Sequence, residues 1–245
     1  MNMMFSITYA TFSILCQLLK LHSSYSLDSE NMILLSCLPD YVSNTIEEIV
    51  QLSLYILLQM TKNSYLATKY IALSNFIRIF LENENDLSSI SRSCGFYIMS
   101  NIIMRMPDTT FMYFIEEICT LLGSKDEYVR ESGYAKILKI FSEERDDKSL
   151  QMSLFYLLHA ICFRVSELKE QNDLTLFFSN YLIVNIIFNP DDGILEKTIS
   201  FKPEARKEVY YAIYRLCCVF PHVSSYIFEE EDRVIPFKNY FLSSN

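Results

Sequence analysis

Residues 108–144 read DTTFMYFIEEICTLLGSKDEYVRESGYAKILKIFSEE, and this stretch decides the predicted fold. Its first half places six apolar residues on one stripe: Phe111, Phe114, Ile115, Ile118, Leu121 and Leu122. The spacing of this stripe fits the 3.6-residue period of an amphipathic helix. Asp108 can cap the start of the helix, and Gly123 is expected to end it.

A second helix is predicted directly after Gly123. Ser124 and Glu127 have the spacing of a capping box, in which each side chain accepts a hydrogen bond from the other residue's backbone N–H. Because about three residues join the two helices, the helices are expected to be antiparallel. Gly133 inside a helix costs about 1 kcal/mol relative to Ala, so we expect a neighbouring helix to approach closely at this residue. The predicted apolar face consists of Val129, Gly133, Ile137, Leu138 and Phe141.

The same pattern recurs on both sides of this unit. First helices are expected near residues 65, 109 and 148, and second helices near 87, 126 and 174. Separations of about 39 to 48 residues are typical of stacked two-helix repeats. The sequence therefore predicts an all-α fold, an alpha-solenoid of stacked antiparallel helix pairs. One of the flanking stripes consists of Leu87, Ile90, Cys94, Ile98 and Ile102.

The ends of the chain are less regular. A helix is predicted over 46–60, and another begins at Pro203 after a strong break at 189–193. The tail after residue 233 has no convincing period. Since no interdomain linker is visible, residues 1–245 are interpreted as a single helical-repeat domain with its clearest repeats at 65–188. The chain is either complete or cut from a longer protein.

Residues 118–138, ICTLLGSKDEYVRESGYAKIL, resemble the repeat of the HEAT/armadillo family. That family typically shows a Leu-Leu pair, an acidic turn, Val-Arg, then small residues and Leu. The residues that match are Leu121, Leu122, Asp126, Val129, Arg130, Gly133, Ala135 and Leu138. The neighbouring units share the helical pattern but lack Val-Arg, so the resemblance covers one unit. It implies a protein-binding scaffold or adaptor built on an alpha-solenoid.

Residues 202–217, KPEARKEVYYAIYRLC, resemble the helical repeats that flank the catalytic domain of large ubiquitin-specific proteases. The catalytic Cys box of that family, Asn-x-Gly-x-Thr-Cys, and its His box are absent from this sequence. This second resemblance implies an alternative function, that of a non-catalytic helical-repeat part of a deubiquitinating enzyme.

Composition limits the classes of function. Hydrophobic residues make up 51% of the 245 residues, which is ample for a buried core and excludes a disordered chain. Only 4 Gly and 6 Pro are present, whereas folds rich in strands need many tight turns. The formal net charge is −9 and the pI is about 4.9, so the chain repels phosphate backbones. No nucleic acid is expected as a partner.

Cysteine usage and the N-terminal segment bear on localisation. The seven cysteines are odd in number and scattered, mostly at apolar positions of helical patterns. This favours an intracellular setting, cytoplasmic or nuclear. Residues 3–21 are either a packed helix or a signal segment. They lack a basic n-region, and polar residues such as Thr8 and Gln17 interrupt them, so no membrane span is expected.

No complete active site is recognisable, so the chain is predicted not to be an enzyme. His159 and Cys162 are three residues apart on one predicted helix, but no orienting third group or oxyanion site accompanies them. Cys217 and Cys218 are adjacent and point about 100° apart, which is poor geometry for one metal ion. We predict no catalytic residue, no cofactor and no metal site. His159 and Cys162 are expected to pack, and Cys217 and Cys218 are expected to be core or surface thiols.

Acidic and aromatic residues are the candidates for partner binding. The pairs Glu116–Glu117 and Glu143–Glu144 are either solvated connections or an acidic rim that attracts a basic partner. Aromatic residues off the main stripes are either buried between repeats or exposed at an interface, where Tyr is favoured. These residues are Tyr113, Tyr128, Phe155, Tyr156, Tyr211 and Tyr214. The predicted partner is a protein with a basic segment, bound at Glu116, Glu117, Glu143, Glu144, Tyr113 and Tyr128.

Overall fold

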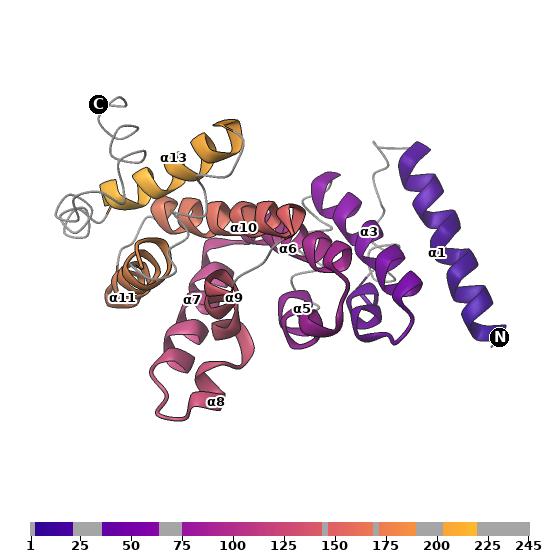
Figure 1. Cartoon of the computed structure of the whole chain (residues 1–245), viewed down its shortest axis with the longest axis horizontal. Coiled ribbons are helices and arrows are strands. Elements are labelled where there is room, and N and C mark those ends of the chain that lie inside the picture. Colours follow the sequence, from indigo (N-terminus) through magenta and orange to yellow (C-terminus); the bar gives the residue numbers. More distant parts are fainter. Residues whose placement is uncertain are drawn as a thin grey trace. The chain divides into compact units, whose positions relative to one another are not determined.

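Every regular element in the part of the chain that the structure describes is a helix. The computed structural model describes residues 3–21, 36–63, 75–143, 147–168, 172–189 and 203–219 (Figure 1). The predicted all-α class is confirmed for these ranges, in which no strand occurs. None of their helices is both long and apolar enough to cross a membrane. The tail after residue 233 lies outside the described residues.

Contacts divide the chain into two compact units. The first consists of Met1–Pro107 with Arg145–Leu157, and the second of Asp108–Glu144 with Leu158–Asn245. Helix α10, Lys148–Glu167, contributes residues to both units. That residues 1–245 behave as one domain stays a prediction.

The first unit is built around helix α3. Its elements are α1 Met3–Leu21, the 3-10 helix η1 Leu38–Ser43, α3 Glu47–Asn63, α5 Phe76–Asn83, the 3-10 helix η2 Glu84–Asp86 and α6 Ser89–Arg105. Helix α3 packs against α1, η1 and α6. On α1, Phe12 is buried with its ring edge-on to Tyr41, at a centroid distance of 5.1 Å. The Cys16 thiol, also buried, contacts the carbonyl oxygen of Leu52 at 3.9 Å.

Helices α5 and α6 meet through aromatic rings. The Phe80 ring lies edge-on to Phe96 with centroids 5.2 Å apart. Just after α5, Glu84 of η2 lies 4.0 Å from Arg92 of α6. Gly95 allows this approach, since a Cβ there would lie 2.0 Å from Phe80 Cε2. The part of the predicted first helix before residue 75 lies outside the described residues.

Helices α3 and α6 run parallel, because contacts join their N-terminal ends to each other and their C-terminal ends to each other. At the N-terminal ends, Glu47 Oε1 accepts hydrogen bonds from the hydroxyls of Ser88 at 2.5 Å and Ser91 at 2.8 Å. At the C-terminal ends, the Arg105 guanidinium donates to the carbonyl oxygens of Thr61 and Lys62. Helix α6 is in turn parallel to the start of α10: Ser93 meets Ser149 at 3.3 Å, and further along Tyr97 meets Tyr156 with ring centroids 5.3 Å apart.

The second unit packs α7 against short helices. Its elements are α7 Asp108–Leu122, α8 Glu127–Arg130, the 3-10 helix η3 Gly133–Ala135, α9 Lys136–Ser142, α11 Asp173–Tyr181, the π-helix η4 Leu182–Ile187 and α13 Pro203–Val219. Helix α7 packs on η3 and α11, and α9 packs on η4. Arg164 of α10 pairs with Asp108 at 2.8 Å and covers the Phe111 ring. Arg215 of α13 lies 4.5 Å from the centre of the Phe163 ring.

The predicted continuous helix after Gly123 is wrong. Helix α8 ends at Arg130, Gly133 has a left-handed φ of +56°, and the α-helix resumes only at Lys136. The predicted capping box is also wrong, because Asp126 is the N-cap and its carboxylate accepts from Tyr128 N at 2.9 Å. Ser124 Oγ instead accepts from Asp126 N at 3.2 Å. Competing side-chain bonds to the backbone in this turn explain the different cap.

Gly95 provides a test of the α5–α6 contact. Helix propensity predicts that Gly95→Ala stabilises the chain by about 1 kcal/mol. The fully buried Phe80 ring instead predicts overpacking, and we expect the free energy of unfolding to fall by about 1–3 kcal/mol. Gly123→Ala is the matched control, since its Cβ would make an ordinary contact 3.5 Å from Cys119 O. Urea denaturation gives the free energy of unfolding of both variants. If Gly95→Ala is as stable as Gly123→Ala, the close packing of Phe80 on Gly95 is wrong.

Gly133 tests the break between α8 and α9. A side chain there meets both a left-handed backbone and Leu121 Cδ1 at 3.2 Å. We expect Gly133→Ala to destabilise the chain by about 1–2 kcal/mol, and Gly133→Leu by more. Asn tolerates the left-handed region, so Gly133→Asn should lie between wild type and Gly133→Ala. Thermal melts give the order, and a rise in Tm for Gly133→Ala would mean that this residue is helical after all.

Candidate functional site

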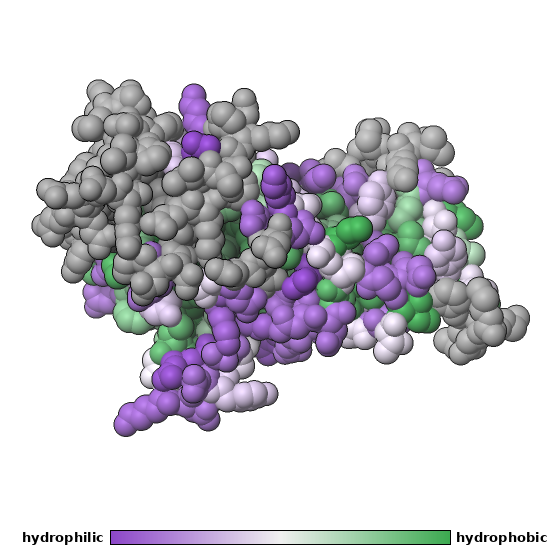
Figure 2. Space-filling view, in the orientation of Figure 1, coloured by the Kyte–Doolittle hydropathy of each residue, from purple (hydrophilic) through white to green (hydrophobic). Residues whose placement is uncertain are grey.

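The two tyrosines predicted to bind a partner are exposed to solvent. Tyr113 on α7 is 64% exposed and Tyr128 on α8 is 83% exposed. Glu116 is exposed on α7, whereas Glu117 is half-buried. Glu143 is half-buried just after α9, and Glu144 lies outside the described residues. Figure 2 shows that hydrophilic residues cover the end of the second unit where Figure 1 places α8.

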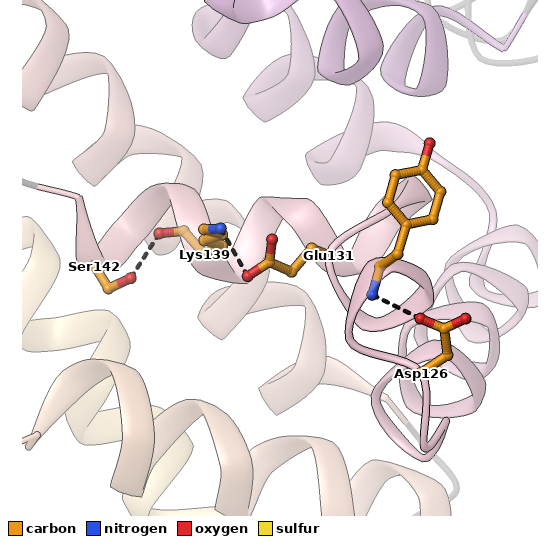
Figure 3. A network of polar contacts seen from close by, with 5 residues as sticks. Asp126, Glu131, Lys139 and Ser142 are labelled. Atoms are coloured by element: carbon orange, nitrogen blue, oxygen red, sulfur yellow. Dashed lines mark hydrogen bonds and ion pairs between the residues drawn. The ribbon is translucent and has the colours of Figure 1, made fainter.

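Three carboxylates surround one lysine in the α8–α9 region. Lys139 Nζ lies 2.7 Å from Glu131 Oε1, and Figure 3 shows these side chains directed toward one another. The hydrogen bond that Lys139 donates to Glu131 raises the pKa of Lys139, and the charges of Glu131, Glu143 and Glu127 raise it further. Glu131 thus has a cationic partner within the chain. Glu116, on the outer face of α7, is the predicted acidic residue most clearly directed to solvent.

The other aromatic residues off the predicted stripes differ in their exposure to solvent. Tyr156 and Tyr211 are exposed, Tyr214 is half-buried and Phe155 is buried. Burial between repeats is therefore wrong for Tyr113, Tyr128, Tyr156 and Tyr211, and right for Phe155. The difference has a physical reason, since the helical period tells which residues share a face but not which faces another helix covers.

The candidate nucleophile on α10 is held in the core. Cys162 is fully buried, and burial raises the pKa of its thiol strongly, so the thiol stays protonated at neutral pH. Burial lowers the pKa of His159, with Glu208 raising it and Arg215 lowering it, and the imidazole stacks on Phe163. The side chains of Cys162 and His159 are therefore packed against their neighbours.

Cysteines elsewhere in the described residues show no reactive pair. All seven are free thiols. Cys217 is buried, and burial raises its pKa to about 12, whereas its neighbour Cys218 is exposed. No group of three or more His, Cys, Asp or Glu side chains in the described ranges is placed to hold a metal ion.

A groove of about 400 Å³ in the first unit was not anticipated from the sequence. Helix α3 provides its floor, with Glu48, Gln51, Leu52 and Tyr55 at helical spacing on one face. The walls are Tyr9 and Cys16 from α1 and Ile90, Ser91 and Cys94 from α6. The predicted core position of Ile90 is wrong, because this side chain is 73% exposed at the rim.

A carboxylate at the end of the groove is held ionised. Burial raises the pKa of Glu47, but hydrogen bonds from Ser88, Ser91 and Gln51 lower it by more, so its pKa lies below the usual 4.5. Further along the groove, burial raises the pKa of Cys94 to about 12, against a weaker opposing effect of Lys62. The groove therefore combines an uncharged thiol with negative charge near the N-terminus of α3.

Comparisons with known proteins leave the chain without a family. No known protein family and no curated protein matches it. Among solved structures, the chain is matched by the crystal structures of two engineered proteins from the Northeast Structural Genomics Consortium. One matches at 13% identity and a TM-score of 0.41 over 86% of this chain and 90% of that one. The other matches at 14% identity and a TM-score of 0.38 over 95% and 67%. The class that the structure itself defines is a protein of packed α-helices.

Glu47 generates a pH-dependent prediction. Its pKa is lower in the folded chain than in the unfolded one, so its stabilising effect is fully present above about pH 4.5 and is lost as the pH falls through the folded pKa. Glu47→Ala should cost about 1–2 kcal/mol at pH 7, the lower part of the range for charged hydrogen bonds because the group is half-exposed. The difference from wild type should shrink below pH 4.5.

Glu48→Ala is the matched control for this measurement, because Glu48 is an exposed carboxylate on the same turn of α3. Denaturation curves recorded from pH 3 to pH 7 compare the two variants. Equal costs for the two substitutions, or a Glu47→Ala cost that does not change with pH, would show that Glu47 does not hold α6.

Proposed function

We propose that this chain is a non-catalytic protein-interaction scaffold, built as a HEAT/armadillo-like alpha-solenoid of stacked antiparallel helix pairs. In such a stack, helices in equivalent positions of successive pairs run parallel. One observation supports the proposal: α3 and α6, which begin near residues 47 and 89, run parallel within the first unit. In the second unit, contacts of Phe163 and Glu167 with Arg215 join α10 to α13.

The exposure of Tyr113 and Tyr128 is the observation that carries the binding role. A tyrosine adds a large contact area to an interface at low entropic cost, and tyrosines are enriched among the residues that dominate binding energy. Glu116 lies one helical turn from Tyr113, and Glu127 precedes Tyr128. A partner segment with basic residues would complement these carboxylates. We therefore propose a basic segment of another protein as the ligand of this surface.

The intracellular location is part of the same proposal. The exposed thiols of Cys37 and Cys218 form no disulfide and suit a reducing compartment, because exposed thiols oxidise readily elsewhere. The burial of Cys162 and Cys217 supports a non-catalytic role, since a protonated core thiol is a poor nucleophile.

Affinity purification from cell lysate tests the binding role. The wild-type chain, a Tyr113→Ala/Tyr128→Ala variant and a Tyr211→Ala control are compared by mass spectrometry. Tyr211 is a suitable control because it is also exposed, on α13. We expect a set of proteins that the double variant loses and the control keeps, with affinities lowered by about 5- to 30-fold. Their recovery should fall as salt rises, because salt screens surface charges.

Two results would contradict this function. One is an identical set of captured proteins for the wild-type chain and the double variant. The other is cleavage of a ubiquitin conjugate by the purified chain, which would show that it carries an active site.

A further inference from the structure

The groove over α3 is shallow and open, which limits what it can bind. Small-molecule sites bury most of the ligand surface. Here the wall residues Ile90 and Tyr9 remain 73% and 44% exposed, so a small molecule in the groove would stay largely in water. A polypeptide that crosses the groove can instead bury one side chain between the walls and continue on either side. Helix-lined grooves commonly receive protein segments in this way.

The apolar part of the groove selects an aliphatic or aromatic side chain. Leu52 and Tyr55 rise from the floor between Tyr9 of α1 and Ile90 of α6. Covering the exposed surface of Ile90 is favourable in proportion to the apolar area removed from water. The surface continues beyond the groove to Tyr97 and Tyr156, whose rings are in contact on α6 and α10. Aromatic side chains thus extend along the face of the first unit.

The negative charge of the groove favours a ligand with a cationic side chain. Among the described residues that line it, Glu48 is the charged one, and its neighbour Glu47 is held ionised by Ser88 and Ser91. The same lining contains no Lys or Arg to neutralise Glu48. A lysine or arginine of a ligand could pair with Glu48 and lie against the rings of Tyr9 or Tyr55, which attract cations.

We propose that the groove formed by α1, α3 and α6 is a second docking site, which takes a segment of a partner protein with an apolar anchor residue next to a lysine or arginine. The anchor lies between Tyr9 and Ile90, and the cation pairs with Glu48. This site belongs to the first unit and is separate from the Tyr113–Tyr128 surface of the second. The docking site depends on the proposed function in one respect, namely that its ligand is a segment of a protein.

Fluorescence anisotropy with defined peptides tests the two chemical requirements. The probe is a short fluorescein-labelled peptide of alternating leucine and lysine. Alternating alanine and lysine keeps the cations without the anchor, and alternating leucine and glutamate keeps the anchor with reversed charge. We expect the wild-type chain to bind the leucine–lysine peptide at least about tenfold more tightly than either control peptide.

Variants of the chain locate the binding. Ile90→Ser and Glu48→Lys should each weaken binding of the leucine–lysine peptide by about tenfold. Ile7→Ser is the control for Ile90→Ser, since Ile7 is an exposed isoleucine of α1 outside the groove lining. Glu82→Lys changes the net charge as Glu48→Lys does, but at an exposed residue of α5 outside the groove lining, and should have little effect. Glu48→Lys should also gain affinity for the leucine–glutamate peptide, as a direct charge contact requires.

Three outcomes would overturn the proposal: no binding of the leucine–lysine peptide by the wild-type chain, wild-type affinity in both groove variants, or equal losses in Glu48→Lys and Glu82→Lys. The same peptide is measured with the Tyr113→Ala/Tyr128→Ala variant. If the Tyr113→Ala/Tyr128→Ala variant binds the peptide as tightly as the wild-type chain, the groove is a separate binding site. If this variant loses affinity while the groove variants keep it, the groove is not the binding site, and the proposed function still holds.

Discussion

The parallel packing of α3 and α6 is the constraint on which the first unit depends. Both helices contain 17 residues, so fixing one pair of ends brings the other pair into register. At the C-terminal ends, the contact uses backbone carbonyls of the last turn of α3, which have no partner within their own helix. Ser88 caps α6 while donating to Glu47 of α3, and Arg105 of α6 donates to the last carbonyls of α3. Polar groups thus set the register of an otherwise apolar contact.

This register creates the groove. It places Ile90, near the start of α6, beside the first two turns of α3, where Glu48 and Tyr55 share a face. Glu47 serves both purposes, because the hydrogen bonds that hold α6 also keep a negative charge at the end of the groove. On the other side of α6, the missing side chain of Gly95 admits the Phe80 ring. Helix α6 therefore packs on α3, α5 and α10, while Ile90 stays exposed.

In the second unit, the candidate surface forms for a different physical reason. There, local turn chemistry matters more than the packing of long helices. Asp126 starts α8, Gly133 turns the chain with a left-handed φ, and Lys139 ties Glu131 back to α9. The result is a short polar segment that carries Tyr128 into solvent instead of a continuous helix that would pack on α7 along its length. The two candidate surfaces are thus a concave one in the first unit and an exposed tip in the second.

The sequence by itself determined the helices and much of their bounds. The apolar stripes predicted starts near 109, 148 and 174, and the structure has helices from 108, 148 and 173. Such patterns are readable because the 3.6-residue period is a local property of the chain. Tyr113 and Tyr128 could be singled out for the same reason, since both lie off the stripes, although their exposure could not be decided.

Only the tertiary structure decided which faces are covered. Ile90 shares a stripe with the buried Ile98 and Ile102, yet it is exposed because α1 and α3 leave a groove beside it. Gly133 fits a helical pattern, yet its backbone is left-handed where it meets Leu121 of α7. Both outcomes depend on neighbours distant in the sequence, and a periodic pattern carries no information about them. Local spacing fixed the helices, whereas the approach of one helix to another fixed the groove and the exposed tyrosines.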